Sequence, residues 1–157
     1  MKKNKEFLMK KGTDELLKTH TLIKKLLQGF SIENDRFAEV TKTLHRAVAA
    51  HTWFEESLFH AMVRKNRAVD ERFLDELVQE HKDLDRLLAS LQKTPPRMKR
   101  ALEAHTRQIR VILETHLTKE RDALYPLSEM VLDAKTLATL AEKMESGKSA
   151  VRDLVKK

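Results

Sequence analysis

Two short stretches of the chain each place a histidine four residues before a glutamate, a spacing that suits metal binding. They are HTWFE, from His51 to Glu55, and HLTKE, from His116 to Glu120. Residues four apart on an α-helix project from the same face, so the imidazole and the carboxylate of each pair can reach one ion. Mixed imidazole and carboxylate ligands suit iron first, and then manganese or zinc. We therefore expect both stretches to contribute to a metal site.

A longer repeat adds two further histidines to this set. DELLKTHTLIKKLL begins at Asp14 and DELVQEHKDLDRLL begins at Asp75, and their histidines, His20 and His81, stand at the same position. Because the two His-x-x-x-Glu stretches are also counterparts, a pair of helices has been used twice. We expect the two halves to lie about a pseudo-twofold axis, so that His20 faces His81 and the two His-x-x-x-Glu pairs face each other.

The two glutamates of these pairs are expected to be buried, which requires a positive partner. Glu55 and Glu120 lie within apolar stripes that carry no Lys or Arg, and an unpaired buried carboxylate costs on the order of several kcal/mol. A pair of metal ions would satisfy two carboxylates and four neutral histidines together. If both glutamates bridge and an oxide or hydroxide joins the ions, each ion keeps one position for a small molecule. The predicted metal ligands are His20, His51, Glu55, His81, His116 and Glu120.

Helices must position these side chains, because the whole chain has a helical period. Only three Gly and three Pro occur, apolar residues recur at steps of three and four, and β-branched runs are absent. Long helices with short connections favour an all-α fold, an antiparallel up-down four-helix bundle with a short additional C-terminal helix. The expected helices are 13–28, capped by Thr13; 31–65, opened by Ser31 or Asn34; 69–93; 96–126, with Pro96 in its first turn and Pro126 ending or kinking it; and 133–144, stopped by Gly147.

Length and composition exclude several classes of protein. The 157 residues suit a single domain, with a core bundle over about 10–130 and a helical tail over about 131–157. The absence of cysteine excludes disulfides, iron–sulfur clusters, thiolate zinc sites and cysteine nucleophiles. No stretch suits a membrane span or a signal peptide, so we expect a cytoplasmic protein. The net charge of +7 is scattered, which argues against nucleic acid as the main partner.

The six predicted ligands, set on four bundled helices, resemble the pattern of the hemerythrin-like, HHE cation-binding domains. The resemblance covers roughly residues 10–130 and includes Glu56 directly after Glu55 and the Leu-Tyr-Pro run that begins at Leu124. It implies a non-haem centre of two iron ions with a bridging oxide or hydroxide, in which manganese or zinc could substitute. Ferritin-like carboxylate proteins use Glu-x-x-His instead, so the order of residues argues against them.

The chain also departs from the best-known members of that family. Oxygen-carrying hemerythrins use a fifth histidine four residues from another on the third helix, but Leu77 and Asp85 occupy the positions four residues from His81. Reversible oxygen carriage is therefore not expected. Four histidines with two bridging glutamates are more similar to the di-iron repair proteins that respond to nitric oxide and oxidative damage, although those carry an N-terminal segment with cysteine. We expect a free-standing member of the family.

Other polar residues are assigned to the surface or to supporting roles. His45 and His60 fall off the apolar stripe, and His105 lies about 16 Å along the helix axis from the nearest predicted ligand. Asp85 could ligate a metal or hold a bound water, although Lys24 occupies the matching place in the first half of the chain. Neighbours of the predicted ligands that we expect to be solvated or to support them are Glu56 and Glu80, and Tyr125 could reach the mouth of the pocket.

These observations favour a di-iron protein that binds or reacts with a small molecule, namely dioxygen, nitric oxide or peroxide, as a sensor, store or stress-protection protein. Nothing in the sequence shapes a pocket for an organic substrate, so an enzymatic role stays open. One alternative is a metal-free helical interaction module, which could associate with nucleic acid, and another is a labile iron reservoir without redox turnover. A homodimer or an unidentified protein partner is compatible with each of these hypotheses.

Overall fold

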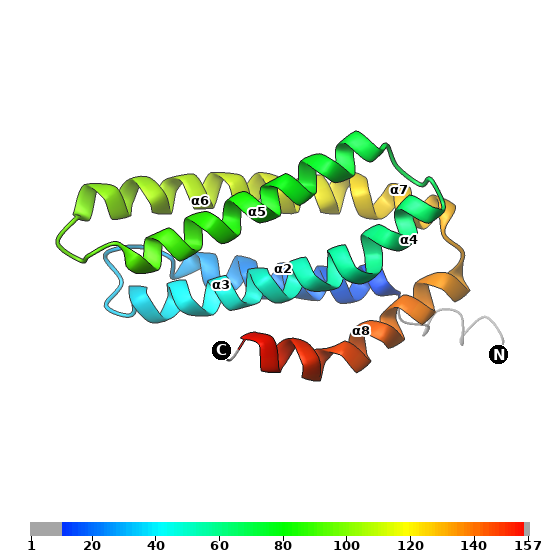
Figure 1. The fold of residues 1–157 in the computed structure, drawn as a ribbon, viewed down its shortest axis with the longest axis horizontal. Coiled ribbons are helices and arrows are strands. Elements are labelled where there is room, and N and C mark those ends of the chain that lie inside the picture. The colour runs from blue at the N-terminus through cyan, green and yellow to red at the C-terminus, as the bar shows by residue number, and fades with distance from the viewer. Residues whose placement is uncertain (1–10, 156–157) are drawn as a thin grey trace.

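The chain forms an elongated bundle of helices (Figure 1). The computed structural model describes the backbone of residues 11–155 and the side chains of residues 11–147, and no strand occurs in that part of the chain. The helices are α2 (Gly12–Gln28), α3 (Phe37–Phe54), η1 (Glu55–Phe59), α4 (His60–Lys65), α5 (Glu71–Lys93), α6 (Lys99–Lys119), η2 (Glu120–Leu124), α7 (Tyr125–Val131) and α8 (Ala134–Val155). Among residues 11–155, no helix combines the length and the apolar character needed to cross a lipid bilayer.

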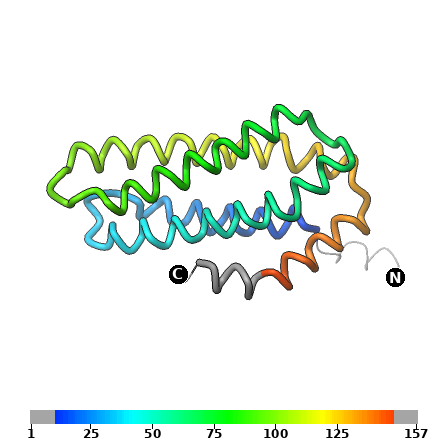
Figure 2. Tube along the Cα trace, viewed as in Figure 1, coloured from blue at the N-terminus to red at the C-terminus, as the bar shows by residue number. Residues whose placement is uncertain are grey.

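Four long helical segments run alternately up and down the bundle (Figure 2). They are α2, the continuous run α3–η1–α4, α5, and the continuous run α6–η2–α7. Helix α2 packs on α3, α3 packs on α5, and α5 packs on α6. The predicted all-α, antiparallel four-helix bundle is therefore confirmed, whereas the domain limits stay a prediction.

Two apolar clusters fill the bundle and leave a polar layer between them. The first surrounds Phe59 and Leu77 at one end, and the second surrounds Ile23 and Leu84 toward the other. His81 lies between Leu77 and Leu84 in the sequence of α5 and is itself buried. The polar layer is thus closed above and below by packed side chains, which strengthens every electrostatic interaction inside it.

The C-terminal helix is longer than expected and covers the outside of the bundle. Helix α8 packs against α2, α3 and η1, and it runs through Gly147 to Val155 instead of stopping at Gly147. A Cβ at Gly147 would lie 3.1 Å from Trp53 Cζ3. Gly147 therefore allows close packing of two helices, and that tertiary contact overrides its usual role as a helix stop.

Three expected helix starts are wrong, and side-chain hydrogen bonds, one tertiary and one local, explain two of them. Thr13 lies inside α2, with Lys11 at the N-cap position, and its Oγ1 donates to Glu129 Oε1 at 2.5 Å. Asn34 donates to the Gly29 carbonyl at 2.8 Å, which holds residues 29–36 in a turn and delays the next helix to Phe37. Pro96 precedes α6, which begins at Lys99.

Both long composite segments contain one π-helical turn at the same place in the repeat. The turn η1 begins at Glu55 and the turn η2 begins at Glu120. A π turn closes i→i+5 hydrogen bonds, so it shifts every later side chain around the helix axis and is frequent at functional sites. The second segment does not end at Pro126 but continues as α7 to Val131. These turns decide which residues face the polar layer.

Candidate metal centre

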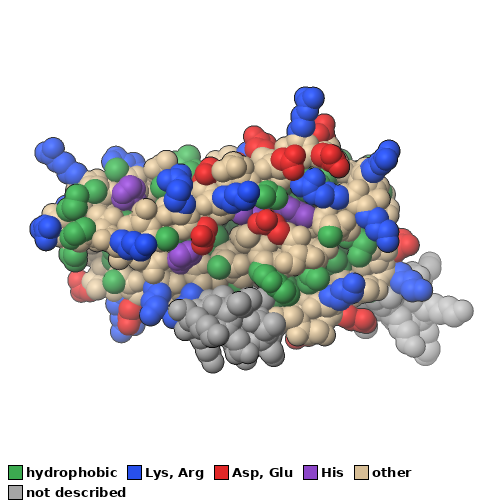
Figure 3. Space-filling model, in the orientation of Figure 1, with side chains coloured by type: hydrophobic (Ala, Val, Ile, Leu, Met, Phe, Trp, Pro, Cys, Tyr) green, Lys and Arg blue, Asp and Glu red, His purple; other side chains and the backbone are tan. Residues whose placement is uncertain are grey.

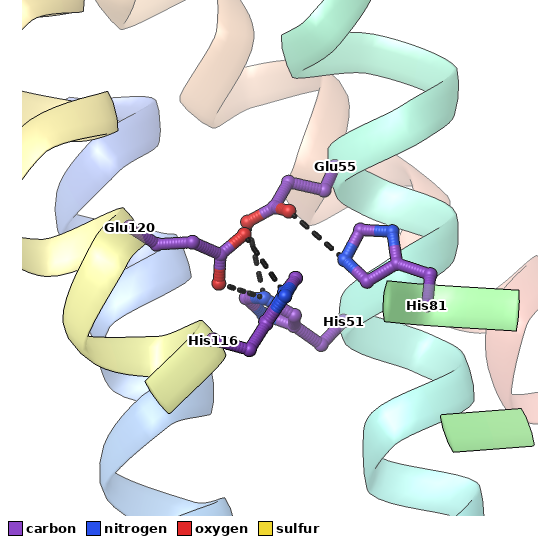
Figure 4. Close-up of side chains that lie close together, drawn as sticks. All are labelled: His51, Glu55, His81, His116 and Glu120. Carbon is purple, nitrogen blue, oxygen red and sulfur yellow. Dashed lines mark hydrogen bonds and ion pairs between the residues drawn. The ribbon is translucent and has the colours of Figure 1, made fainter. Parts of the chain in front are cut away.

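The structure brings all six predicted ligands into the polar layer. Each of the four helical segments supplies one histidine, and the two π turns supply the glutamates. Five of the six residues are drawn in Figure 4, where the two carboxylates face each other between imidazoles from three helices. The exposed fractions are 2% for His20, 2% for His51, 0% for Glu55, 3% for His81, 1% for His116 and 0% for Glu120.

These side chains form a compact group of possible metal ligands. One atom from each of five residues lies within 4.8 Å of the others, namely His51, Glu55, His81, His116 and Glu120. His20 joins the group through a carboxylate, since its Nε2 lies 3.1 Å from Glu120 Oε1. A metal-binding centre is therefore supported, while the assignment of each residue as a ligand stays a prediction.

The four carboxylate oxygens divide between two sides of the layer. On one side, which we call the α2–α3 side, His51 Nε2 lies 3.0 Å from Glu55 Oε2 and 3.0 Å from Glu120 Oε1. On the other, the α5–α6 side, His81 Nε2 lies 3.2 Å from Glu55 Oε1, and His116 Nε2 lies 3.3 Å from Glu120 Oε2. Each carboxylate thus offers one oxygen to each side, which is the geometry of a bridging ligand.

The distances between these donor atoms suit metal coordination. Bonds of about 2.1 Å at right angles put neighbouring ligand atoms about 3.0 Å apart. On the α5–α6 side the contacts of His81 Nε2 and His116 Nε2 lack hydrogen-bond geometry, and both nitrogens are buried without a hydrogen-bond partner. Glu55 Oε1 and Glu120 Oε2 are also left without one. Buried polar atoms are nearly always satisfied in proteins, so this cluster fits a cation between them.

In three of the four imidazoles, a hydrogen bond at Nδ1, on the side of the ring away from the cluster, orients Nε2 inward. Two of these bonds involve carboxylates. His81 Nδ1 lies 2.8 Å from Glu56 Oε2, and His116 Nδ1 lies 2.9 Å from Glu80 Oε1. Such carboxylate partners fix the ring of a metal-bound histidine and raise its basicity. The expectation that Glu56 and Glu80 support ligands is therefore consistent with their contacts.

The α2–α3 side has weaker outer partners. His51 Nδ1 lies 2.6 Å from the hydroxyl of Thr19, which itself donates to the Leu16 carbonyl at 2.6 Å. His20 Nδ1 is buried without a hydrogen-bond partner. The two halves of the repeat thus differ outside the ligand set, although they match within it.

Protons balance the buried charges in the metal-free protein. Burial alone would lower the pKa of His51, but the Glu55 and Glu120 carboxylates outweigh it and raise that pKa to about 10. At His116, burial would likewise lower the pKa, but the Glu120 and Glu80 carboxylates outweigh it and raise the pKa to about 9. Burial would also raise the pKa of the Glu55 carboxyl, but the neighbouring imidazoles lower it well below its usual value. Both carboxylates are therefore ionised and paired with imidazolium.

Tyr125 lies inside the site and not at its mouth. It is 2% exposed, and its hydroxyl donates to Glu55 Oε2 at 2.6 Å while lying 3.0 Å from His20 Nε2. Burial and the two carboxylates raise the pKa of Tyr125 well above its usual value, so the hydroxyl stays protonated. The expected place at the pocket mouth is wrong, because the π turn Glu120–Leu124 rotates Tyr125 inward.

The expectation that His60 lies at the surface is wrong. Its side chain is 3% exposed, and Nε2 lies 3.3 Å from Glu55 Oε1. The π turn η1 shifts His60 onto the inward face, five residues after Glu55, at the place that Tyr125 occupies five residues after Glu120. Comparing the two halves of the repeat at this spacing is the signal that could have found it.

The remaining polar candidates lie away from the cluster. Asp85 is 69% exposed and pairs with His45 Nε2 at 2.8 Å, so its contacts do not support a role as ligand. A pocket of about 330 Å³ between α3 and α5 is lined by Trp53, Glu56, His81 and Asp85 among others. Through this pocket, solvent approaches His81. The Glu56 side chain, which is 34% exposed, lies between the solvent and the buried His81 ring.

Comparison with known proteins gives one matching family. The family model for the hemerythrin HHE cation-binding domain matches residues 11–128 and, in a second overlapping match, residues 72–156. No curated protein and no solved structure matches the chain. The overlap is consistent with the internal repeat, because the second helix pair resembles the first. The match spans most of the chain and includes the buried His and Glu cluster, so this protein belongs to the hemerythrin HHE cation-binding domain family.

Proposed function

We propose that this protein is a non-haem di-iron protein that binds or reacts with a small molecule, dioxygen, nitric oxide or peroxide, as a sensor, store or stress-protection protein. The supporting observation is the division of the carboxylate oxygens. Glu55 and Glu120 each offer one oxygen to either side of the polar layer, and each side also holds two of the four predicted histidine ligands. Two ions bridged by both carboxylates would use every one of these atoms.

The donor set favours iron, with manganese or zinc as substitutes. When bound, a pair of ferrous ions would supply two electrons to one small molecule. The protein's own contribution is orientation and exclusion of water. Phe59, which is 0% exposed, packs against the rings of His60 and Tyr125 and helps to exclude water. The protonated Tyr125 hydroxyl donates to Glu55 Oε2 at 2.6 Å and so holds that carboxylate in position.

The test begins with a metal count. Protein from iron-supplemented cells, purified without chelator, should contain about two irons per chain by plasma mass spectrometry. Glu120→Ala should lose metal, whereas Glu114→Ala on the same helix, whose side chain is 58% exposed, should retain it. A wild-type protein that stays metal-free after anaerobic reconstitution with ferrous iron would refute the proposal and favour a helical interaction module.

A second measurement separates reaction from storage. The ferrous protein is mixed with dioxygen, nitric oxide or peroxide in a stopped-flow instrument, and its rates are compared with those of free ferrous ion. Faster reaction of the protein with one of them supports the proposal and identifies the ligand. Rates no greater than those of free ferrous ion would instead indicate a labile iron reservoir.

Thermal stability alone does not separate these hypotheses. If the protein were a metal-free module and Glu120 had no partner, Glu120→Ala would remove an unpaired buried carboxylate, and its free energy of unfolding would be unchanged or higher. However, Glu120 contacts His20, His51 and His116, so its removal leaves imidazolium without a counter-charge and destabilises the metal-free protein as well. The metal count is therefore the decisive measurement.

The cytoplasmic location and the partners are further proposals from the sequence. A cysteine-free chain suits a reducing compartment, and cell fractionation tests this. Lys and Arg are interspersed with Asp and Glu on the face in Figure 3, which favours a small-molecule ligand over nucleic acid as the main partner. Sedimentation of the purified protein tests for a homodimer.

A further inference from the structure

His60 is a buried imidazole without a hydrogen-bond partner. It begins α4, its side chain is 3% exposed, and neither Nδ1 nor Nε2 forms a hydrogen bond with the described residues. Leaving one buried polar group unsatisfied costs about 1–3 kcal/mol. Two such atoms on one ring therefore indicate that something else satisfies at least one of them.

The ring of His60 approaches the same carboxylate oxygen as His81. His60 Nε2 lies 3.3 Å from Glu55 Oε1, and His81 Nε2 lies 3.2 Å from it. The two rings are nearly parallel, with an interplanar angle of 18° and centroids 6.0 Å apart. Two imidazoles that direct Nε2 at one oxygen, both without hydrogen-bond geometry, are arranged as ligands of one ion beside that oxygen.

Five such atoms gather on the α5–α6 side. They are buried and have no hydrogen-bond partner, and they comprise His60 Nε2, His81 Nε2, His116 Nε2, Glu55 Oε1 and Glu120 Oε2. Three nitrogens and two oxygens, with a bridging oxide or hydroxide, would complete the six ligands that an octahedral ion prefers. The α2–α3 side has only His20 and His51, with the Tyr125 hydroxyl in the place equivalent to His60.

We propose that His60 is a fifth imidazole ligand, bound to the same ion as His81 and His116. This inference rests on the proposed two-ion centre and deepens it, because it makes the two ions unequal. The ion on the α5–α6 side would then have no open position, which would leave the ion held by His20 and His51, beside the Tyr125 hydroxyl, to receive the small molecule. His60 must move slightly inward to coordinate, since it lies outside the compact group that contains His81 and His116.

Anaerobic titration with Co²⁺ tests this proposal through binding and not activity. Isothermal calorimetry gives the number of ions and the affinity of each, and the visible spectrum of bound Co²⁺ reports its coordination. The variants are His60→Ala, the matched Tyr125→Phe at the equivalent position, and His45→Ala as a control on a partly exposed histidine. If His60→Ala fails to fold by circular dichroism, His60→Gln replaces it, because it retains volume with a poorer ligand.

The wild type is expected to bind two Co²⁺ per chain. His60→Ala should weaken one of them by more than the roughly 10- to 100-fold that loss of an outer partner of a ligand costs, and should change the Co²⁺ spectrum. Free imidazole added to His60→Ala should restore both the affinity and the Co²⁺ spectrum. His45→Ala should retain two ions at wild-type affinity. Tyr125→Phe should still bind two ions, with no more than the roughly 10- to 100-fold weakening that loss of an outer partner of a ligand costs.

Failure of this inference is distinct from failure of the two-ion centre. If the wild type binds two ions and His60→Ala binds both with unchanged affinity and spectrum, His60 is not a ligand and the inference is overturned. If the wild type binds one ion, the two-ion centre is refuted, and the role of His60 is upheld or overturned by whether His60→Ala weakens that ion. If the wild type binds none, both proposals are overturned.

Discussion

Metal loading at neutral pH should release about two protons from the imidazoles, and this follows from the charge balance of the metal-free site. His51, with a pKa of about 10, and His116, with a pKa of about 9, are both protonated at pH 7. A metal ligand must be a neutral imidazole, so both protons leave when the ions bind. The raised pKa of His81, where burial is outweighed by Glu55 and Glu56, can add to this number.

The same protons weaken metal binding by an amount that depends on pH. Neutral pH lies about three units below the pKa of His51 and two below that of His116. Each unit costs a factor of about 10 in affinity, so the combined affinity of the site at pH 7 is reduced by roughly 10⁵. The logarithm of that affinity should therefore rise by about two per pH unit up to about pH 8 and less steeply above it.

Calorimetry in buffers of different ionisation enthalpy measures the released protons directly. Zn²⁺ is suitable because it has no redox chemistry. Release should be two or more protons at pH 7 and should fall by more than one between roughly pH 8 and 10. A proton from a bridging water would add a constant amount at every pH. Release of less than one proton at pH 7 with both sites filled would refute the pairing of the two carboxylates with imidazolium.

The metal-free protein should show the opposite trend in stability. A folded-state pKa above the unfolded value of about 6.5 contributes stability that is complete below that value and is lost as pH rises through the folded pKa. Because His51 and His116 have pKa values of about 10 and 9, the free energy of unfolding should fall between roughly pH 7 and 10. Urea unfolding across this range measures it, and a rising stability would contradict the assignment of imidazolium.

Three substitutions test other parts of the structure. Tyr125→Phe removes the donor to Glu55 and should cost about 1.5–3 kcal/mol in metal-free stability, measured by urea unfolding, with the metal count unchanged. Glu80→Ala should weaken one ion roughly 10- to 100-fold in calorimetry, whereas Glu76→Ala, at a 58% exposed side chain, should have no such effect. Gly12→Ala would bring a Cβ within 2.9 Å of three side-chain atoms of Leu140 in α8 and should lower stability by about 1–3 kcal/mol; a stabilised variant would contradict that packing.

The buried cluster of His and Glu side chains could be predicted from the sequence because its residues obey regular helical spacing. His51 and Glu55 lie one turn apart before the first π turn, so the period of 3.6 residues places them correctly. His20 and His81 lie within uninterrupted helices, α2 and α5, and the repeat identifies them as counterparts. Regular spacing also explains why the bundle itself was predicted well.

Residues after the π turns could not be found in this way. The extra residue in η1 places His60 on the inward face, although an unbroken α-helix would turn it outward, and η2 does the same for Tyr125. Residue types alone do not distinguish a π turn from an α turn. Each π turn here begins at a buried glutamate, whose partners include side chains from other helical segments that are not visible in the local sequence. The end of α8 was missed for a similar reason, since Gly147 serves a contact with Trp53.

Divergence between the two halves of the repeat has a chemical consequence. Thr19 and Glu80 precede His20 and His81 at equivalent positions, yet Thr19 offers a neutral hydroxyl to His51 while Glu80 offers a carboxylate to His116. Glu80 is held in turn by Lys119 at 2.7 Å. Carboxylate partners raise the basicity of a ligand, so the α5–α6 side should bind its ion first and more tightly.

The residues that could bind Nδ1 of His81 and His20 also differ between the two halves, and again the carboxylate is on the α5–α6 side. Glu56 accepts from His81 Nδ1, whereas its counterpart Arg121 is 47% exposed and pairs with Asp122, which leaves His20 Nδ1 without a partner. With His60 added to the α5–α6 side, that half has the greater number of ligands and the more basic ones. The proposed centre therefore combines one ion that is held firmly with one that is held by fewer groups, and the small molecule would meet the second.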